Sequence, residues 1–231
     1  MGRLILICLL LIISFGAWAQ QKDVTLCAYP DWPPYTNPDD PHGGLSTDII
    51  KQAFITQGYI VHTLWMPWAR AMATAKQGQC SGLSEAYYID QRAVWGEFSD
   101  AYFQVNVAFF SRKIQNVSFQ TLQDLKGLNI AHLRGASVSA EFDAANYLNK
   151  SMVNSINQAL RMLNSKRFDL IVDDEAAVKF AIKKLNEQDF GFKQRITMLS
   201  PYLTSRNLHV VFSKKEPRTP ELLMAFNLGL K

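Results

Sequence analysis

The run Phe168-Asp169-Leu170-Ile171-Val172-Asp173-Asp174-Glu175 (residues 168–175) decides the fold of this chain. Its apolar part has the length and composition of a buried strand, and it ends in three consecutive acids. An amphipathic stretch follows over residues 176–186, which predicts a helix directly after the strand. Buried strands that alternate with helices are typical of a parallel sheet covered by helices. The run therefore predicts an α/β protein.

The same alternation continues on both sides of this run. We expect further strands at 24–28, 59–64, 81–84, 104–111, 129–133, 153–156 and 208–212, and helices at 46–57, 68–77, 158–165 and from about 219 to the end. Ligands of open α/β sheets bind beyond the carboxyl ends of the strands. Polar groups occupy four such positions in this chain, at 31–35, 85–92, 135–137 and 173–175.

The first 19 residues predict the cellular compartment. Arg3 precedes an apolar run from Leu4 to Ile13, and the small-residue pattern Ala17-Trp18-Ala19 follows it. This order is typical of a secretory signal peptide at residues 1–19, cut before Gln20. The run is shorter than the roughly 20 residues of a membrane span. We therefore expect a soluble periplasmic protein.

The charges of the chain are nearly balanced. Lysine and arginine number 24 and aspartate and glutamate 20, for a net charge of +4, and the lysines are scattered. Nucleic-acid partners need a clustered basic face, so this composition disfavours them. A small ligand, and a protein that works as a monomer, are the expectations that remain.

Cys27 and Cys80 are the cysteines that follow the predicted signal peptide. They can form a disulfide in an oxidising compartment, but their spacing does not show whether their Cα atoms lie within bridging distance. The chain has four isolated histidines, at positions 42, 62, 132 and 209. None is spaced from a cysteine as metal ligands are, so we expect neither a metal nor a cofactor.

Seven motifs follow one another in a specific order. They are Trp32-Pro33-Pro34-Tyr35, Gly44-Leu45-Ser46-Thr47-Asp48-Ile49, Asp90-Gln91-Arg92 with Phe98-Ser99, Asp124-Leu125-Lys126-Gly127, Gly135-Ala136-Ser137, Asp174-Glu175 and the run from Leu208 to Lys214. Each is weak alone, but the ordered set resembles the bacterial extracellular solute-binding proteins of family 3, which serve polar amino-acid transporters.

The resemblance implies a periplasmic-binding-protein type II fold. In this fold two α/β lobes are joined by two crossover strands, and a ligand cleft lies between the lobes. Lobe 1 is then expected to comprise residues 22–108 plus 208–231, and lobe 2 residues 112–203. Such lobes close on a ligand through contacts that form only when both engage it.

The resemblance also implies roles for three polar residues. Arg92 matches the position whose guanidinium holds a ligand α-carboxylate, which a planar fork of donors suits. Ser137 would add a hydroxyl and backbone donors at a helix N-terminus, unless it is a plain helix cap. Asp174 matches the acidic partner of the ligand α-ammonium. Arg92 and Asp174 would then hold a zwitterion from opposite lobes.

Aromatic and basic residues complete the expected cleft. Trp32 would form an aromatic wall, whereas Tyr35 is expected to be structural. Trp68 and Arg70 begin the helix after the second strand, and the topology places both at the cleft mouth. Packing at the lobe surface is the alternative for each of these residues.

Glu85 and Tyr87 depart from the family pattern, which has small hydroxyl residues seven and five positions before the arginine. A carboxylate at Glu85 would repel a ligand carboxylate, because charges about 4 Å apart interact by several kcal/mol at intermediate dielectric. Either Glu85 selects a ligand with an extra amine, or it pairs internally with Arg70 or Arg92.

These features predict a non-enzymatic receptor that captures a small polar, amino-acid-like ligand for an ABC permease. A sensor input without a transporter is one alternative. Another is a dehydratase-like enzyme on the same scaffold, in which Glu85, His132 or Asp174 would act as acid or base. The sequence shows no nucleophile-base-orienter set, which disfavours catalysis.

Overall fold

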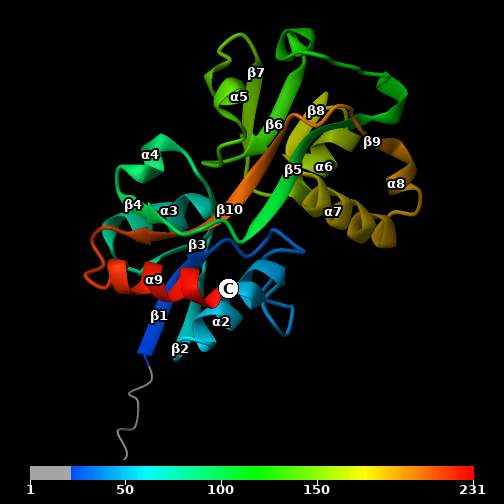
Figure 1. Cartoon of the computed structure of the whole chain (residues 1–231). Coiled ribbons are helices and arrows are strands. Elements are labelled where there is room, and N and C mark those ends of the chain that lie inside the picture. Colours follow the sequence, from blue (N-terminus) through cyan, green and yellow to red (C-terminus); the bar gives the residue numbers. More distant parts are fainter. Residues whose placement is uncertain (1–21) are drawn as a thin grey trace, which may run out of the picture.

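The computed structural model of this chain describes residues 22–231 (Figure 1). The predicted signal peptide, residues 1–19, lies outside this range. Within residues 22–231, no helix has both the length and the apolar character needed to cross a bilayer.

The first lobe is built on three parallel strands and two antiparallel neighbours. Strand β1 (Lys22–Ala28) lies between β2 (Tyr59–Trp65) and β3 (Gly82–Tyr87), and all three are parallel. Strand β10 (Thr204–Ser213) runs antiparallel to β3, and the short β4 (Gly96–Phe98) runs antiparallel to β10. The helices of this lobe are α2 (Leu45–Ile55), α3 (Trp68–Gln77), α4 (Asp90–Ala93) and α9 (Thr219–Gly229).

Helices cover both faces of this sheet because successive side chains of a strand point to opposite sides. Leu26 packs in one core with Phe54 of α2 and Phe226 of α9. The next residue, Cys27, packs in a second core with Ala71 of α3.

The second lobe repeats the parallel arrangement. Strand β6 (Asn129–Leu133) lies between β7 (Asn149–Val153) and β8 (Leu170–Asp174), and all three are parallel. Strand β5 (Phe103–Arg112) runs antiparallel to β8, and β9 (Ile196–Met198) runs antiparallel to β5. The helices of this lobe are α5 (Ala140–Ala144), α6 (Ile156–Asn164), α7 (Glu175–Gln188) and α8 (Phe192–Arg195).

The two long strands β5 and β10 connect the lobes. They pair with each other over Phe103–Val107 and Thr204–Leu208, and Figure 1 shows them side by side where the lobes meet. Beyond this segment β5 pairs only in the second lobe and β10 only in the first. The expected fold of two lobes with two crossover strands is confirmed, while the residue bounds of each lobe stay a prediction.

Two local predictions differ from the structure. The sequence predicts a strand at 153–156, whereas β7 lies at Asn149–Val153. This strand is at the edge of the sheet and mostly exposed, so its sequence lacks the apolar signal of a buried strand. The turn at 135–137 does not open a helix directly, because α5 begins only at Ala140 and is capped by Ser139.

A disulfide joins Cys27 to Cys80 and so ties the end of β1 to the segment before β3. Their Cα atoms lie 6.3 Å apart, within the usual range for such a bridge. The pairing that the sequence left open is therefore present.

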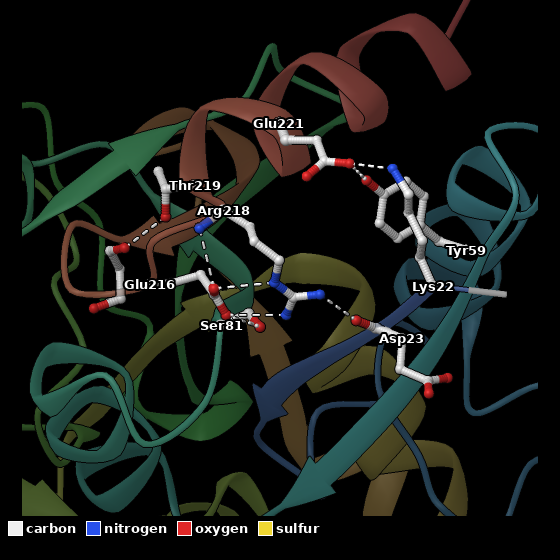
Figure 2. A network of polar contacts seen from close by, with 9 residues as sticks. Lys22, Asp23, Tyr59, Ser81, Glu216, Arg218, Thr219 and Glu221 are labelled. Atoms are coloured by element: carbon white, nitrogen blue, oxygen red, sulfur yellow. Dashed lines mark hydrogen bonds and ion pairs between the residues drawn. The ribbon is translucent and has the colours of Figure 1, made fainter. Parts of the chain in front are cut away.

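A polar network binds the start of β1 to the start of α9 (Figure 2). We call it the β1–α9 network, and its residues are Lys22, Asp23, Tyr59, Ser81, Glu216, Arg218, Thr219 and Glu221. The Glu221 carboxylate forms an ion pair with Lys22 and accepts a hydrogen bond from the Tyr59 hydroxyl at 2.8 Å.

Arg218 is the centre of the other half of this network. Its Nε and Nη2 each donate to Glu216 at 3.1 Å, and its Nη1 donates to the Asp23 carbonyl at 2.9 Å. The Ser81 hydroxyl donates to the same Glu216 carboxylate at 2.9 Å. The carboxylates of Glu216 and Glu221 thus each have a cationic partner.

Candidate ligand-binding cleft

Two adjoining hollows around Arg92 lie between the lobes. The inner cavity has a volume of about 60 Å³, and the outer groove, which is open to solvent, has about 940 Å³. Seven side chains of the inner cavity are aromatic or charged: Tyr29, Trp32, Trp68, Tyr87, Glu85, Arg92 and Asp173. Arg92 and Ser137 line both hollows, so they mark the boundary between them.

Arg92 is 3% exposed, and its side chain is only partly satisfied by hydrogen bonds. Its Nη1 donates to the Tyr87 carbonyl at 2.8 Å, its Nη2 contacts the Met72 sulfur at 3.7 Å, and its Nε has no partner. The guanidinium lies 5.3 Å from the centre of the Trp68 ring. Burial, and then the nearby charge of Arg206, lower the pKa of Arg92 to about 10, so it stays charged at neutral pH.

A guanidinium buried in this way needs an anion. No carboxylate forms an ion pair with Arg92 within residues 22–231. A ligand carboxylate at the boundary of the two hollows would supply one and would accept a hydrogen bond from the free Nε.

Glu85 is also 3% exposed, at the wall of the inner cavity. It accepts hydrogen bonds from the backbone amide of Tyr29 at 3.0 Å and from the Ser84 hydroxyl. Burial raises the pKa of Glu85 to about 8, although these two hydrogen bonds act in the opposite direction. No ion pair joins it to any lysine, arginine or histidine of the described chain.

The two aspartates at the end of β8 have different environments. Asp174 is 1% exposed and caps α7, since its carboxylate accepts from the Ala177 amide at 2.8 Å. It lines a separate hollow of about 20 Å³ rather than the inner cavity. Asp173 lines both. Burial is the main cause that raises the pKa of Asp173 to about 7 and that of Asp174 to about 6.

Aromatic side chains of the first lobe reach across to the second. The Trp68 indole donates to the Gly135 carbonyl at 3.1 Å, and the Tyr29 hydroxyl donates to the Asn154 carbonyl at 3.0 Å. Trp32 is buried with its ring centroid 4.5 Å from that of Tyr35. The lobes are therefore in contact around the inner cavity.

The sequence of this chain matches a known protein family. A model of the family described as bacterial extracellular solute-binding proteins, family 3, matches residues 24–231. The chain belongs to this family. No curated protein matches the chain in sequence.

Solved structures similar to this solute-binding protein share its fold. A mutant of arginine-bound ArgBP from T. maritima has a TM-score of 0.75 at 18% identity, with 92% of this chain and 96% of that chain covered. A histidine kinase sensor domain with similarity to periplasmic binding proteins gives 0.79 at 18% identity, with 92% and 90% covered. The BvgS VFT2 domain of Bordetella pertussis gives 0.75 at 13% identity, with 92% and 88% covered. The type II fold of the family is thereby shown.

The structure brings five of the seven predicted site residues to one place in this solute-binding protein. Trp32, Trp68, Glu85, Arg92 and Ser137 all line the inner cavity. The Ser137 hydroxyl is already used, because it donates to the Asp143 carboxylate at 2.5 Å. Asp174 lies beside the cavity as described above.

Arg70, the seventh predicted residue, is exposed on α3 and lines neither hollow. Residues outside these seven also line the hollows. Tyr29 and Asp173 face the inner cavity, and Arg206 of β10 faces the outer groove. Tyr29 immediately follows β1, so the rule that ligands bind at carboxyl ends of strands could have found it. The same rule pointed to the run 173–175, which contains Asp173, the last residue but one of β8. Arg206 has no such signal, because it lies within a strand that runs the other way.

Proposed function

We propose that this chain captures a small zwitterionic, amino-acid-like solute in the cleft between its lobes. The observation that carries this proposal is Arg92, a buried guanidinium with a free Nε and no carboxylate partner within residues 22–231. Arg92 would bind the ligand carboxylate, and the acidic end of β8, with Asp174 as the family residue, would bind the α-ammonium. Trp32 and Trp68 would form the apolar walls between these two contacts.

Capture works through both lobes at once. Arg92 and Trp68 belong to the first sheet and its helices, whereas Ser137 and Asp174 belong to the second. A ligand that contacts both sides stabilises the closed arrangement relative to an open one, and the hinge is expected in β5 and β10.

The proposed setting is the periplasm, reached through the predicted signal peptide at residues 1–19. Delivery to an ABC permease is our first choice of partner, and it is supported by family membership and by the fold shared with arginine-bound ArgBP. The fold shared with the histidine kinase sensor domain and the BvgS VFT2 domain supports a sensor input as the second choice.

One observation favours a second class of function. Glu85 and Asp173 have pKa values raised to about 8 and about 7, which suits proton transfer near neutral pH. A dehydratase-like reaction would require one of them to reach the bound molecule. Incubation of each binding compound with the protein, followed by mass spectrometry, would reveal a product if the protein is an enzyme.

The test of capture is a thermal-shift screen of the chain without residues 1–19, after unfolding and refolding to remove any bound molecule. The screen covers amino acids, polyamines, keto acids and small peptides. A ligand at 100 times its Kd stabilises the fold by about 2.7 kcal/mol, which is easily measured. We expect a shift with at least one α-amino acid. A shift with compounds of other classes alone, or none at all, would contradict the amino-acid assignment.

A further inference from the structure

The inner cavity is lined by more acidic than basic side chains. Its charged wall residues are two acids, Glu85 and Asp173, and one base, Arg92. The acids come from opposite lobes, Glu85 from β3 and Asp173 from β8. A ligand that only offers a carboxylate to Arg92 would leave both acids without a partner.

The hydrogen bonds of these acids come from neutral groups. Glu85 accepts from the Tyr29 amide and the Ser84 hydroxyl, and Asp173 accepts from the Asp174 amide at 2.7 Å. Neither acid has an ion pair within the described part of the chain. Buried carboxylates are normally paired with a cation, and otherwise they take up a proton. The internal ion pair that the sequence allowed for Glu85 is therefore not what holds this residue in place.

The size of the cavity limits what can enter it. One water-sized group needs roughly 15 Å³ of such volume, so about 60 Å³ holds roughly four of them. This matches an ammonium group with its last methylene or a guanidinium group, and it is too small for a whole amino acid. The rings of Trp32, Trp68 and Tyr87 line the same space and attract cations through their faces.

We propose that Glu85 and Asp173 determine ligand specificity by binding a cationic nitrogen group at the far end of the ligand, which makes the ligand class a basic amino acid. This inference rests on the proposed function, since Arg92 must hold the carboxylate at the other end. The cleft then binds three charged groups of the ligand. They are the carboxylate at Arg92, the α-ammonium at the end of β8, and the terminal cation in the inner cavity.

Entry of a cation should displace protons from this cavity. The titratable groups that face Glu85 are Tyr29 after β1, Tyr87 on β3, Tyr102 before β5, Arg92 on α4 and Asp173 on β8. Burial raises the pKa of all three tyrosines, so they stay neutral, and Arg92 stays charged. Glu85 and Asp173 are the two groups left to ionise near neutral pH. The cation favours their charged forms, so affinity for it should rise from pH 6 to pH 8.5.

The test compares ligands of the same shape that differ in charge. Isothermal titration calorimetry at pH 7.5 would measure L-arginine against L-citrulline and L-lysine against L-norleucine, with agmatine as a cation without a carboxylate. We expect each basic amino acid to bind at least tenfold more tightly than its neutral counterpart. Titrations in two buffers of different ionisation enthalpy should show release of about one proton with arginine.

Glu85→Gln is the matching variant, because it keeps the shape of the side chain and removes its charge. It should reduce the arginine-to-citrulline preference at least fivefold and lower the number of protons released. Glu216→Gln, in the β1–α9 network away from the cavity, is the control and should change neither. Circular dichroism would check that both variants are folded.

The outcomes separate this inference from the proposed function. Equal affinity for arginine and citrulline overturns the cation site but leaves amino-acid capture intact. Binding of agmatine as tight as that of arginine would remove the carboxylate contact at Arg92, on which both the proposed function and the basic amino-acid ligand class rest. If folded wild-type protein binds none of the cationic probes, the inference is wrong.

Discussion

Two regions of this protein contain buried or half-buried carboxylates, and the regions differ in whether these carboxylates have cationic partners. In the β1–α9 network, Glu216 is held by Arg218 and Glu221 by Lys22 (Figure 2). In the inner cavity, Glu85 is more deeply buried and has no cation among residues 22–231.

The pKa directions follow this difference. The hydrogen bond with Arg218 lowers the pKa of Glu216, and the one with Lys22 lowers the pKa of Glu221. Burial raises the pKa of Glu85 to about 8. Within residues 22–231, Glu216 and Glu221 of the β1–α9 network have cationic partners and Glu85 has none. We expect the acids without a cationic partner to serve ligand binding and the paired ones to serve stability.

Removal of the disulfide, which connects these two regions, is expected to have the largest effect on the free energy of unfolding. Cys27 lies two residues before Tyr29 of the cavity, and Cys80 precedes Ser81 of the network. With 53 residues of sequence separation, loop-closure entropy gives about 4 kcal/mol of stabilisation. The double variant Cys27→Ser/Cys80→Ser should lose this amount in urea unfolding. A loss below about 1 kcal/mol would mean that noncovalent contacts alone hold β1 in register beside the cavity.

The acids of the two regions should affect stability in different pH ranges, and this is the second largest expected effect. The folded pKa of Glu85 is raised to about 8 above its usual 4.5, so the folded state binds this proton more tightly than the unfolded state. That contribution is complete below pH 4.5 and is lost as the pH rises through 8. Asp173 acts with the same sign, because its pKa is raised from 3.8 to about 7.

We therefore expect the free energy of unfolding without ligand to fall by several kcal/mol between pH 5 and pH 8.5, with Glu85 contributing more than Asp173. The lowered pKa values of Glu216 and Glu221 act only at lower pH, where protonation removes their contribution. Urea titrations across this range measure the slope. Stability that rises over the same interval would show that the cavity acids are paired in solution.

Replacing one arginine in each region gives a third comparison, of ligand affinity against stability. Arg92→Ala removes the proposed carboxylate partner and should weaken ligand binding by at least about 2 kcal/mol, roughly 30-fold. Arg218→Ala, in the network, should leave affinity unchanged and reduce stability instead. Calorimetry with the hit of the thermal-shift screen measures both. Unchanged affinity in Arg92→Ala would remove this residue from the site.

Most of the fold could be predicted from the sequence because strands and helices alternate with clear apolar patterns. The run at 168–175 forms β8 and the start of α7 as expected, and β5 and β10 connect the lobes. The edge strand β7 was harder, since a mostly exposed strand has no apolar pattern to detect.

The site was predicted less completely. Residue type and position predicted Arg92 and Glu85, and both line the inner cavity. Only the structure shows that Asp173 rather than Asp174 lines this cavity and that Arg70 is exposed. The sequence of β8 places two aspartates side by side, and which of them caps α7 depends on the backbone of the following turn. That Glu85 has no ion pair among the described residues likewise depends on the packing of distant segments.

The central claim is that Glu85 is kept for a ligand rather than for the fold. The free energy of unfolding of Glu85→Gln, measured without ligand at pH 8.5 beside wild type and Glu216→Gln, tests it most directly. We predict that Glu85→Gln is more stable than wild type by at least about 1 kcal/mol, because it removes a buried charge that has no cationic partner within residues 22–231. Glu216→Gln should be less stable by up to about 1 kcal/mol, because it loses its ion pair with Arg218. If Glu85→Gln is instead the destabilised variant, Glu85 serves the fold and the account is contradicted.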